Sequence, residues 1–366
     1  MKNILLTTNT LCAGGAEILA SNLAIEYKLK GFNVSYICYG GILDSKGNYL
    51  YEKLKNNDIN ILLLNKKLSI KNVFSIVKSY VKFINKFNPQ IIHSHLDQSD
   101  LLIYFCSFFV KDIIYVRTLH TGSTIMRIPN YLHRKMSLFY NNIACSENVK
   151  SNLEMNGFIG SIDIINNGVP TKEIIKSSIK SSEKKLKIGL VGNMKKVHYK
   201  AVKGHQILIN AVCEIKEFLS NKATINFFGT GELEDALKKD VKTNKVNNII
   251  KFHGLVNNIN KEYSEIDILV APSLFEGLPL TCIEAGMHGI PLLTSNISAF
   301  NSLNVDSRLE FDSMNYKDLS KKLVHLINNY ETFKINATNN RKWFLNNFSL
   351  EKCANEYISI FKKIEK

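Results

Sequence analysis

Residues 268–285 read ILVAPSLFEGLPLTCIEA. The apolar run Ile268–Ala271 predicts a buried strand, because strands of a parallel sheet are covered on both faces and carry few polar residues. Two prolines and a glycine end this strand, and an apolar helix is predicted from about Leu280. A strand, a short loop and a helix form the repeating unit of a parallel sheet. Glu276 in the loop and Glu284 in the helix are both expected near the carboxyl end of the strand, where such sheets bind ligands.

The same alternation of short β-rich runs and longer helical stretches extends over the chain. A first series of strands is predicted at Asn3–Thr8, Val34–Tyr39, Ile59–Leu64, Ile91–Ser94, Ile113–Arg117, Ile143–Cys145 and Ile162–Ile165. A second series is predicted at Lys187–Val191, Ile225–Phe228, Ile249–His253, Ile268–Ala271 and Pro291–Thr294. Two doubly wound α/β domains follow, covering residues 1–172 and 187–345 and joined by a Ser- and Lys-rich linker at 173–186. Residues 346–366 contain a last amphipathic helix, and the ligand cleft is expected between the domains.

Composition narrows the class of protein further. With 366 residues, 45% of them hydrophobic and 22% charged, the chain is neither disordered nor fibrous. No apolar run reaches the roughly 18 residues that a membrane span needs, and the first residues are more typical of a strand than of a signal peptide. We therefore expect a cytoplasmic protein. The seven cysteines are scattered without a C-x-x-C spacing, which argues against a disulfide framework and against a zinc site.

The net charge of +15 favours an anionic partner: nucleic acid, an anionic membrane or a phosphorylated substrate. Most of the cations are lysines, whereas proteins that read base edges rely on arginine, so no nucleic-acid partner is expected. The stretch from Ile59 to Leu96 has no acidic residue, and Lys71, Lys78 and Lys82 recur there at helical spacing. Two interpretations stay open: a helix docked on anionic lipid at the inner face of the cytoplasmic membrane, or a packed helix with a solvated lysine face.

Three glycine-containing turns follow predicted strands. Gly14 and Gly15 precede a helix, whose N-terminal amides attract anions. Lys203 stands beside a glycine at the start of another helix and is suited to a phosphate, although simple solvation explains it as well. Gly229 belongs to a third turn, Gly229-Thr230-Gly231-Glu232. Tight-turn geometry alone also explains such glycines, so each turn by itself is weak evidence.

Taken in order, these motifs resemble the retaining glycosyltransferases of family 4, which have the GT-B fold of two Rossmann-like domains facing across a cleft. The element from Glu276 to Glu284 matches the E-x7-E signature of that family in the form F-E-G-L-P-L-x-x-x-E-A. The resemblance extends over most of the chain through Gly14-Gly15-Ala16-Glu17, Cys145-Ser146-Glu147, Asn167-Gly168-Val169, Lys203-Gly204, Gly229-Thr230-Gly231-Glu232 and His253-Gly254.

The resemblance implies roles for individual residues. The glycine turn and Lys203 would hold the nucleotide diphosphate, Glu284 the ribose, and Glu276 with the adjoining amides the donor sugar. His120, after the fifth predicted strand, would lie beside the transferred sugar. The implied catalytic residues are His120, Glu276 and Lys203, and the implied donor-binding residues are Gly14, Gly15, Asn193, Lys203, Gly229, Glu276, Gly277, Leu278, Leu280, Thr281 and Glu284. Asn193 stands where the family usually has arginine, and Lys195 or Lys196 is the candidate replacement. The last helix is expected to cross back to the first domain.

The function implied is transfer of a hexose or N-acetylhexosamine from a nucleotide sugar, expected to be a UDP-sugar, to a lipid-linked bacterial surface glycan. No cofactor and no metal are expected, since no D-x-D metal signature occurs. The residues expected at the acceptor or the membrane are Lys71, Lys78, Lys82, Arg127, Arg134 and Lys135. Two alternatives stay open: a sugar-nucleotide epimerase or phosphorylase on the same fold, and a catalytically silent partner subunit that binds nucleotide sugar. An acceptor role also stays open for His93 and His95.

Overall fold

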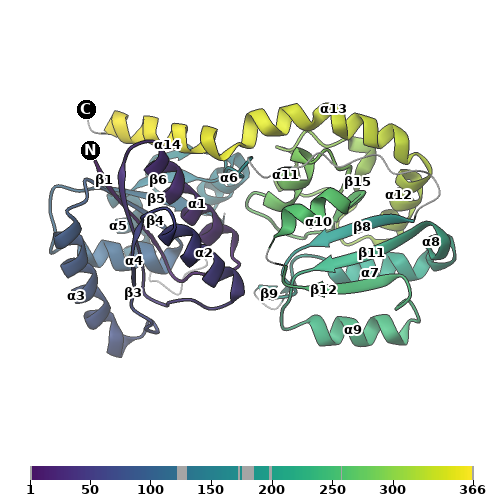
Figure 1. The fold of residues 1–366 in the computed structure, drawn as a ribbon, viewed down its shortest axis with the longest axis horizontal. Helices are drawn as coiled ribbons and strands as arrows, with labels where there is room; N and C mark the ends of the chain where they lie inside the picture. Colours follow the sequence, from purple (N-terminus) through teal and green to yellow (C-terminus); the bar gives the residue numbers. More distant parts are fainter. Residues whose placement is uncertain are drawn as a thin grey trace. The chain divides into compact units, whose positions relative to one another are not determined.

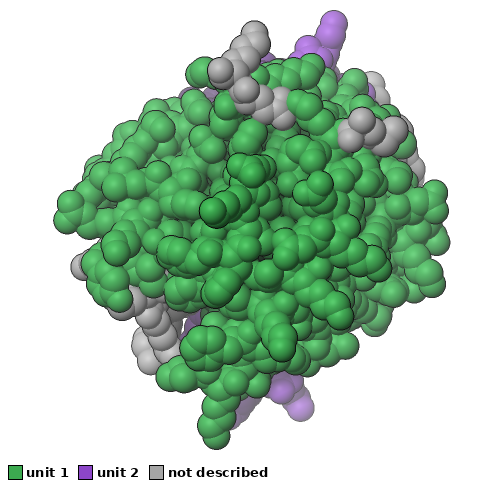
Figure 2. Space-filling model, turned by 90° about the vertical axis from the view of Figure 1, so that its left-hand side faces the viewer, with its two compact units in different colours: residues 1–170, 348–366 green, residues 171–347 purple. Residues whose placement is uncertain are grey.

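The computed structural model describes residues 2–121, 130–171, 174, 185–197, 200–256 and 258–364. The chain divides into two compact units, 1–170 together with 348–366, and 171–347 (Figure 2). Each unit contains a parallel sheet with helices around it (Figure 1). Among the described residues, no helix is both long and apolar enough to span a bilayer.

The first unit has a seven-stranded parallel sheet in the order β3-β2-β1-β4-β5-β6-β7. Its strands are β1 (Asn3–Thr8), β2 (Asn33–Cys38), β3 (Asn60–Leu63), β4 (Ile91–His95), β5 (Ile114–Leu119), β6 (Asn141–Ala144) and β7 (Ile162–Ile164). The order reverses between β1 and β4, which makes the carboxyl ends of these two strands the switch point of the sheet.

Apolar residues alternate between the two faces of this sheet. Ile4 and Leu6 pack into a core with helices α1 (Gly15–Leu29), α2 (Ser45–Lys55) and α14 (Leu350–Ile364). Leu5, between them, packs on the opposite face with α3 (Ile70–Phe87), α4 (Asp97–Cys106) and α5 (Asn130–Phe139). The remaining helix of the unit is α6 (Glu147–Met155). The C-terminal helix α14 is therefore part of the first unit, anchored by a hydrogen bond of 2.7 Å between the hydroxyls of Tyr357 and Thr118.

The second unit has a six-stranded parallel sheet in the order β12-β11-β8-β13-β14-β15. Its strands are β8 (Leu186–Val191), β11 (Ala223–Phe228), β12 (Ile250–Gly254), β13 (Ile268–Ala271), β14 (Leu292–Ser295) and β15 (Glu310–Phe311). A separate two-stranded antiparallel ribbon pairs β9 (Lys196–Val197) with β10 (Lys200–Ala201). The order of the large sheet reverses between β8 and β13, its switch point.

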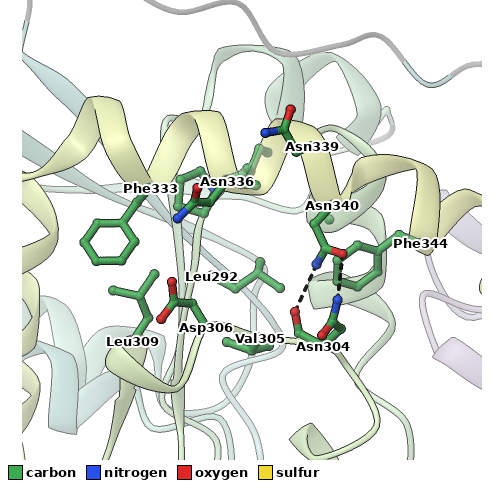
Figure 3. A pocket seen from close by; sticks show the side chains of 14 residues that line it. Leu292, Asn304, Val305, Asp306, Leu309, Phe333, Asn336, Asn339, Asn340 and Phe344 are labelled. Atoms are coloured by element: carbon green, nitrogen blue, oxygen red, sulfur yellow. Dashed lines mark hydrogen bonds between the residues drawn. The ribbon is translucent and has the colours of Figure 1, made fainter.

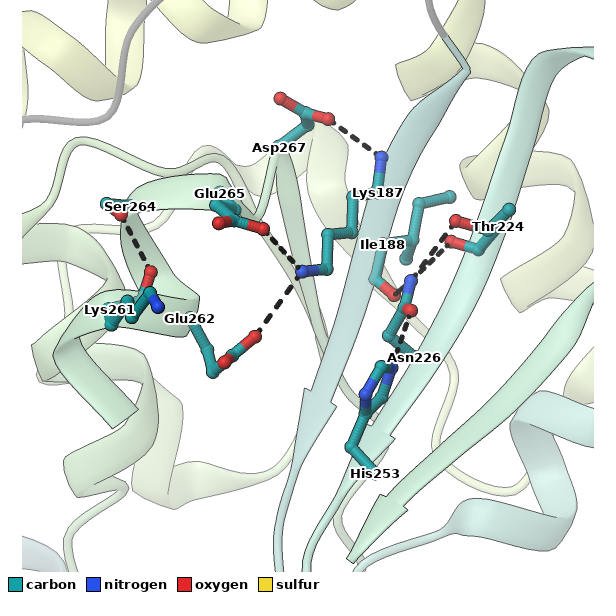
Figure 4. A network of polar contacts seen from close by, with 10 residues as sticks. All are labelled: Lys187, Ile188, Thr224, Asn226, His253, Lys261, Glu262, Ser264, Glu265 and Asp267. Atoms are coloured by element: carbon teal, nitrogen blue, oxygen red, sulfur yellow. Dashed lines mark hydrogen bonds and ion pairs between the residues drawn. The ribbon is translucent and has the colours of Figure 1, made fainter. Parts of the chain in front are cut away.

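The second unit is closed by α7 (His205–Glu214), α8 (Lys216–Lys222), α9 (Glu234–Thr243), α10 (Ile259–Glu265), α11 (Leu280–Met287), α12 (Tyr316–Asn328) and α13 (Tyr330–Phe348). Lys187 on β8 fastens α10 to the sheet, because its Nζ lies 3.3 Å from Glu262 and 3.0 Å from Glu265 (Figure 4). In the same view the Nε2 atom of His253 lies 2.9 Å from the Oδ1 atom of Asn226.

The predicted fold class, two doubly wound parallel-sheet units, is confirmed. All twelve predicted strands form, with ends that differ by at most two residues. The ribbon β9-β10 and the short edge strand β15 were not predicted, because strands of two residues carry no periodicity. Strand β8 begins at Leu186, within the stretch predicted as linker, and the second unit extends to Asn347.

Candidate active site

The loops that follow β8, β11 and β13 meet at the carboxyl edge of the second sheet, around its switch point. Lys203 lies between the ribbon β9-β10 and α7, and Glu276 lies in the loop between β13 and α11. The Nζ atom of Lys203 is 2.6 Å from the Oε1 atom of Glu276. The structure therefore brings together two of the three predicted catalytic residues, 73 positions apart, where an open α/β sheet binds its ligand.

The Lys203–Glu276 pair is held by a third polar group. The hydroxyl of Ser273 donates a hydrogen bond of 2.8 Å to the same Oε1 atom of Glu276. The side chains of Lys203 and Glu276 are 25% and 12% exposed, so the pair is reachable from solvent but largely surrounded by protein. A lysine in this setting can exchange its carboxylate partner for an anionic ligand and remain paired with a negative charge.

Glycines allow these loops to pack closely. Gly204 has a φ of +69°, and a Cβ atom there would lie 1.9 Å from the carbonyl oxygen of Pro272. Gly229 has a φ of +134°, and a Cβ atom there would lie 2.2 Å from the carbonyl oxygen of Gly192. Glycine is thus needed at both positions for backbone conformation and for space, and this close packing sets the position of Lys203.

Glu284 lies in α11, as predicted, and its carboxylate has an aromatic partner. The hydroxyl of Tyr263 donates to the Oε2 atom of Glu284 at 2.9 Å and to the carbonyl oxygen of Thr281 at 3.2 Å. Tyr263 is fully buried, and this burial raises the pKa of its hydroxyl well above the usual value, so that it stays a donor. The orientation of Glu284 is therefore fixed within the second unit.

The turn around Asn193 is joined by hydrogen bonds to the loop that follows β11. Lys195 and Lys196, the candidate replacements for the missing arginine, are both exposed. Glu232 precedes α9 and accepts a hydrogen bond of 2.9 Å from the backbone amide of Lys196. That carboxylate thus holds the start of the β9-β10 ribbon and does not cap a helix.

In the first unit, Gly14 and Gly15 lie at the start of α1, as predicted. The carboxylate of Glu17 occupies part of this region: a Cβ atom on Gly14 would lie 2.1 Å from its Oε2 atom. The same carboxylate lies 3.4 Å from the thiol of Cys12, and Glu17 is only 8% exposed. An anion bound at these amides would therefore have to displace the Glu17 side chain.

His120 follows β5 directly, and the structure places His95 against it. The Nδ1 atom of His95 lies 3.1 Å from the Nε2 atom of His120. His93 and His95, for which an acceptor role stayed open, are both completely buried in β4, and their contacts lie inside the protein. The Nε2 atom of His93 contacts the Thr118 hydroxyl at 2.8 Å, and its Nδ1 atom lies 3.3 Å from the Tyr27 hydroxyl. These two histidines therefore support His120 from the protein interior.

Acidification is expected to destabilise the first unit. Burial lowers the pKa of His93 to about 3 and holds the pKa of His95 well below the usual value of about 6.5. At these two histidines the unfolded chain then binds more protons than the folded chain at pH below about 6.5. Their contribution to the free energy of unfolding is therefore present in full above that pH and falls on acidification. Each histidine should contribute a loss of about 1.4 kcal/mol per pH unit.

Urea unfolding followed by circular dichroism at pH 7.5, 6.0 and 5.0 measures this loss. The His93→Gln variant, which removes one of these titrating histidines, should show a shallower dependence. Equal stability at all three pH values would contradict the expectation.

The predicted acceptor or membrane residues lie on neighbouring helices of the first unit. Lys71, Lys78 and Lys82 are exposed on α3, and Arg134 and Lys135 are exposed on α5. Arg127 lies outside the described residues. Phe74 on the same helix is 82% exposed, because only Ile76, Tyr80 and Ile84 of α3 are buried.

A cavity of about 480 Å³ lies elsewhere in the second unit, between α13 and the start of β14 (Figure 3). Its lining includes Leu292, Asp306, Phe333 and Asn336. Leu292 is the first residue of β14, so the cavity belongs to the amino edge of the parallel sheet, opposite to Lys203 and Glu276. None of the predicted site residues lines it.

Sequence reasoning missed Ser273 and Tyr263, which position the site, and it did not predict the contact of His95 with His120. Ser273 could have been found, since it lies three residues before Glu276 in the loop. The contacts of Tyr263 and His95 depend on how α10 packs and on strand register, which the sequence does not reveal. Within the described ranges, no cluster of three or more His, Cys, Asp or Glu side chains could hold a metal ion, and all seven cysteines are free.

Comparisons with known proteins agree with this geometry. The family described as Glycosyltransferase Family 4 matches residues 13–173, and the family described as Glycosyl transferases group 1 matches residues 185–329. An uncharacterised glycosyltransferase of Haemophilus influenzae is 23% identical over 365 residues, covering 95% of this chain and 96% of the relative. An Escherichia coli UDP-Gal:alpha-D-GlcNAc-diphosphoundecaprenol alpha-1,3-galactosyltransferase is 24% identical, covering 88% and 86%.

The same fold is found among solved structures. Anabaena Alr3699/HepE, solved in complex with UDP and glucose, superposes with a TM-score of 0.81 at 16% identity, covering 99% of this chain and 100% of that one. Two parallel sheets in two units, together with this superposition, define an α/β protein of the GT-B fold. The chain belongs to glycosyltransferase family 4 and is a glycosyltransferase.

Proposed function

We propose that this enzyme is a retaining, metal-independent glycosyltransferase that moves a hexose or N-acetylhexosamine from a UDP-sugar to a lipid-linked bacterial surface glycan. The observation that carries the proposal is the Lys203–Glu276 pair, 2.6 Å apart at the switch point of the second sheet. The pair offers a cation for a diphosphate and a carboxylate for sugar hydroxyls within one site.

The relatives support the choice of donor and acceptor. The Anabaena structure contains UDP and glucose, and the E. coli relative is named for transfer from UDP-Gal to a diphosphoundecaprenol-linked sugar. The net charge of +15 is compatible with an acceptor of that kind, because a lipid diphosphate is anionic.

The reaction breaks the bond between the anomeric carbon and the diphosphate oxygen, and forms a bond from that carbon to an acceptor hydroxyl oxygen. The acceptor proton leaves with the diphosphate product or passes to solvent. Negative charge grows on the leaving group, so Lys203, the amides of Gly14 and Gly15, and the N-terminus of α11 stabilise the transition state electrostatically. Glu276 binds the donor sugar, Glu284 binds the ribose, and His120 contacts the transferred sugar.

A thermal-shift panel of nucleotides and nucleotide sugars tests donor binding, with UDP and UDP-sugars expected to raise the melting temperature most. Product analysis with and without a lipid-linked acceptor then tests the reaction. Transfer that requires the acceptor supports the proposal, whereas conversion of the donor alone would indicate an epimerase or phosphorylase. Binding of UDP without any turnover would overturn the proposal in favour of a silent nucleotide-sugar-binding subunit.

Activity should be retained in excess EDTA, because Lys203 and the helix N-termini replace a metal at the leaving group. An NMR assignment of the product anomer tests retention of configuration. Loss of activity in EDTA with recovery on adding Mg²⁺ or Mn²⁺ would refute metal independence, and an inverted anomer would refute retention.

We further propose that the first unit binds the surface of an anionic membrane through the face formed by α3, α4 and α5. Helix α3 packs against α4, and α4 against α5. Large apolar side chains on this face are exposed, among them Ile70 at 90%, Phe74 at 82% and Phe109 at 68%. Helix α3 carries four lysines and no acidic residue in its sequence. Exposed aromatic residues beside a lysine stripe combine the two contributions that hold peripheral proteins on anionic lipid.

The Phe74→Ser/Phe109→Ser variant is expected to lower binding to phosphatidylglycerol vesicles at least tenfold, because each inserted aromatic side chain is worth about 1.5–3 kcal/mol. Vesicle flotation measures the partition, with phosphatidylcholine vesicles as the neutral reference. Ile335→Ser, which removes an exposed apolar side chain of the second unit, is the matched control and should bind like the parent. Equal binding to both lipids, or none to either, would argue against the proposed surface.

A further inference from the structure

Three imidazole rings lie in contact at the carboxyl ends of β4 and β5. His93 and His95 are two residues apart on β4 and therefore face the same side of the sheet. Their ring centroids are 4.3 Å apart, and the rings of His95 and His120 stack with centroids 5.3 Å apart and an interplanar angle of 25°. The strand register that pairs His95 with Thr118 brings His120, two residues further on, beside His95.

The hydrogen bond between His95 and His120 contains a single proton. Its two nitrogens, Nδ1 of His95 and Nε2 of His120, are 3.1 Å apart. Burial lowers the pKa of His120 to about 4 and the pKa of His95 well below the usual value, so both rings are neutral near pH 7 and each has one N–H. One ring must donate and the other must accept.

The surroundings of His95 decide between the two arrangements. Its Nε2 atom is buried and has no hydrogen-bond partner among the described residues. If His120 were the donor, His95 would carry its proton on this Nε2 atom and bury an unpaired N–H group, which is rare in folded proteins. If His95 donates through Nδ1, only a lone pair is left unpaired at Nε2, and His120 carries its proton on Nδ1.

We propose that His95 is a positioning residue that fixes His120 in the tautomer protonated at Nδ1. His120 then has one N–H that is not used by His95, and this group donates a hydrogen bond to a hydroxyl of the transferred sugar. The role in transfer rests on the proposed function, in which His120 contacts that sugar, whereas the tautomer assignment rests on the geometry alone.

A second layer holds His95 in place. His93 lies against its ring and is itself fixed by Thr118 at 2.8 Å and by Tyr27 at 3.3 Å. The Thr118 hydroxyl also contacts the Tyr357 hydroxyl of α14 at 2.7 Å. The tautomer of His120 is therefore supported by groups from β4, β5, α1 and the C-terminal helix.

Two substitutions separate positioning from general support. Asparagine at position 95 keeps an N–H donor close to the place of the histidine Nδ1 atom, whereas leucine keeps the bulk and removes the donor. His95→Leu should lower kcat about three- to tenfold, the value of one hydrogen bond to substrate, with the KM for the nucleotide sugar changed less than twofold. His95→Asn should recover most of the loss.

Nitrogen NMR of histidine-labelled full-length protein reads the tautomer without activity, and His120→Gln assigns the signals. We expect His120 protonated at Nδ1 in the parent and in His95→Asn, and a mixture of tautomers in His95→Leu. A parent His120 protonated at Nε2, or a tautomer unchanged in folded His95→Leu, would overturn the proposal. The expected tautomer together with full activity of His120→Gln would instead contradict the catalytic role of His120 and leave the positioning intact.

Discussion

Replacing Lys203 by alanine is expected to lower the kcat of glycosyl transfer about 10²- to 10³-fold, the usual cost of losing one preorganised donor at a developing negative charge. Lys203 is the cation that the second unit presents at its switch point, 2.6 Å from Glu276. The substitution also leaves the Glu276 carboxylate without its positive partner, so a diphosphate would meet a negative charge there. Initial rates with a UDP-sugar and a lipid-linked acceptor measure the effect.

The fold should tolerate this change, because the Lys203 side chain is partly exposed and its removal opens no cavity in the core. Lys239→Ala, which removes an exposed lysine from α9 of the same unit, is the matched control and should keep parental activity. Lys203→Ala with unchanged kcat and an unchanged melting temperature would disprove the assignment of Lys203 to the leaving group.

Replacing Arg117 by methionine is expected to destabilise the first unit by about 3–5 kcal/mol, the usual cost of leaving a buried charge without its partner. Arg117 and Asp100 are each 1% exposed, with Nη1 and Oδ2 4.0 Å apart. Arg117 also donates through Nε to Asn142 at 2.8 Å, and its guanidinium lies 5.2 Å from the centre of the Tyr140 ring. Burial raises the pKa of the Asp100 carboxyl to about 7, so the loss should be greater at pH 8 than at pH 6.

Chemical unfolding followed by circular dichroism measures this loss, and the fluorescence of the single tryptophan, Trp343, reports on the second unit as an internal reference. Arg308→Met removes the arginine of an exposed pair with Asp306 and should cost less than about 1 kcal/mol. The double variant Arg117→Met/Asp100→Asn should regain part of the stability. A loss below 1 kcal/mol for Arg117→Met would show that the buried pair contributes little.

The sheets could be predicted from sequence because their strands are short, solidly apolar runs with polar ends. Asn3–Thr8 and Ile268–Ala271 form as predicted, residue for residue. The position of Glu276 in a loop and of Glu284 in a helix followed from the prolines and glycine that separate them. These are local signals, and backbone conformation responds to them before any tertiary contact forms.

The contacts that position the site depend on long-range register. Lys203 and Glu276 are far apart in the sequence, and only the strand order that places β8 beside β13 brings them together. The contact between His95 and His120 likewise requires β4 to pair with β5 in one register. Phe74 shows a further limit, because helical periodicity does not tell which of several apolar residues on α3 are covered by the sheet.

The membership of α14 in the first unit has a consequence for how the protein is made. Tyr357 and Phe361, near the end of the chain, are buried in the same core as residues of β1 and β2. The ribosome synthesises these strands before the second unit and α14 after it, so the first unit cannot complete its core until α14 has been made. The second unit, continuous from 171 to 347, has its whole sequence available earlier. Nascent chains lacking the last helix should therefore engage chaperones through their amino-terminal half.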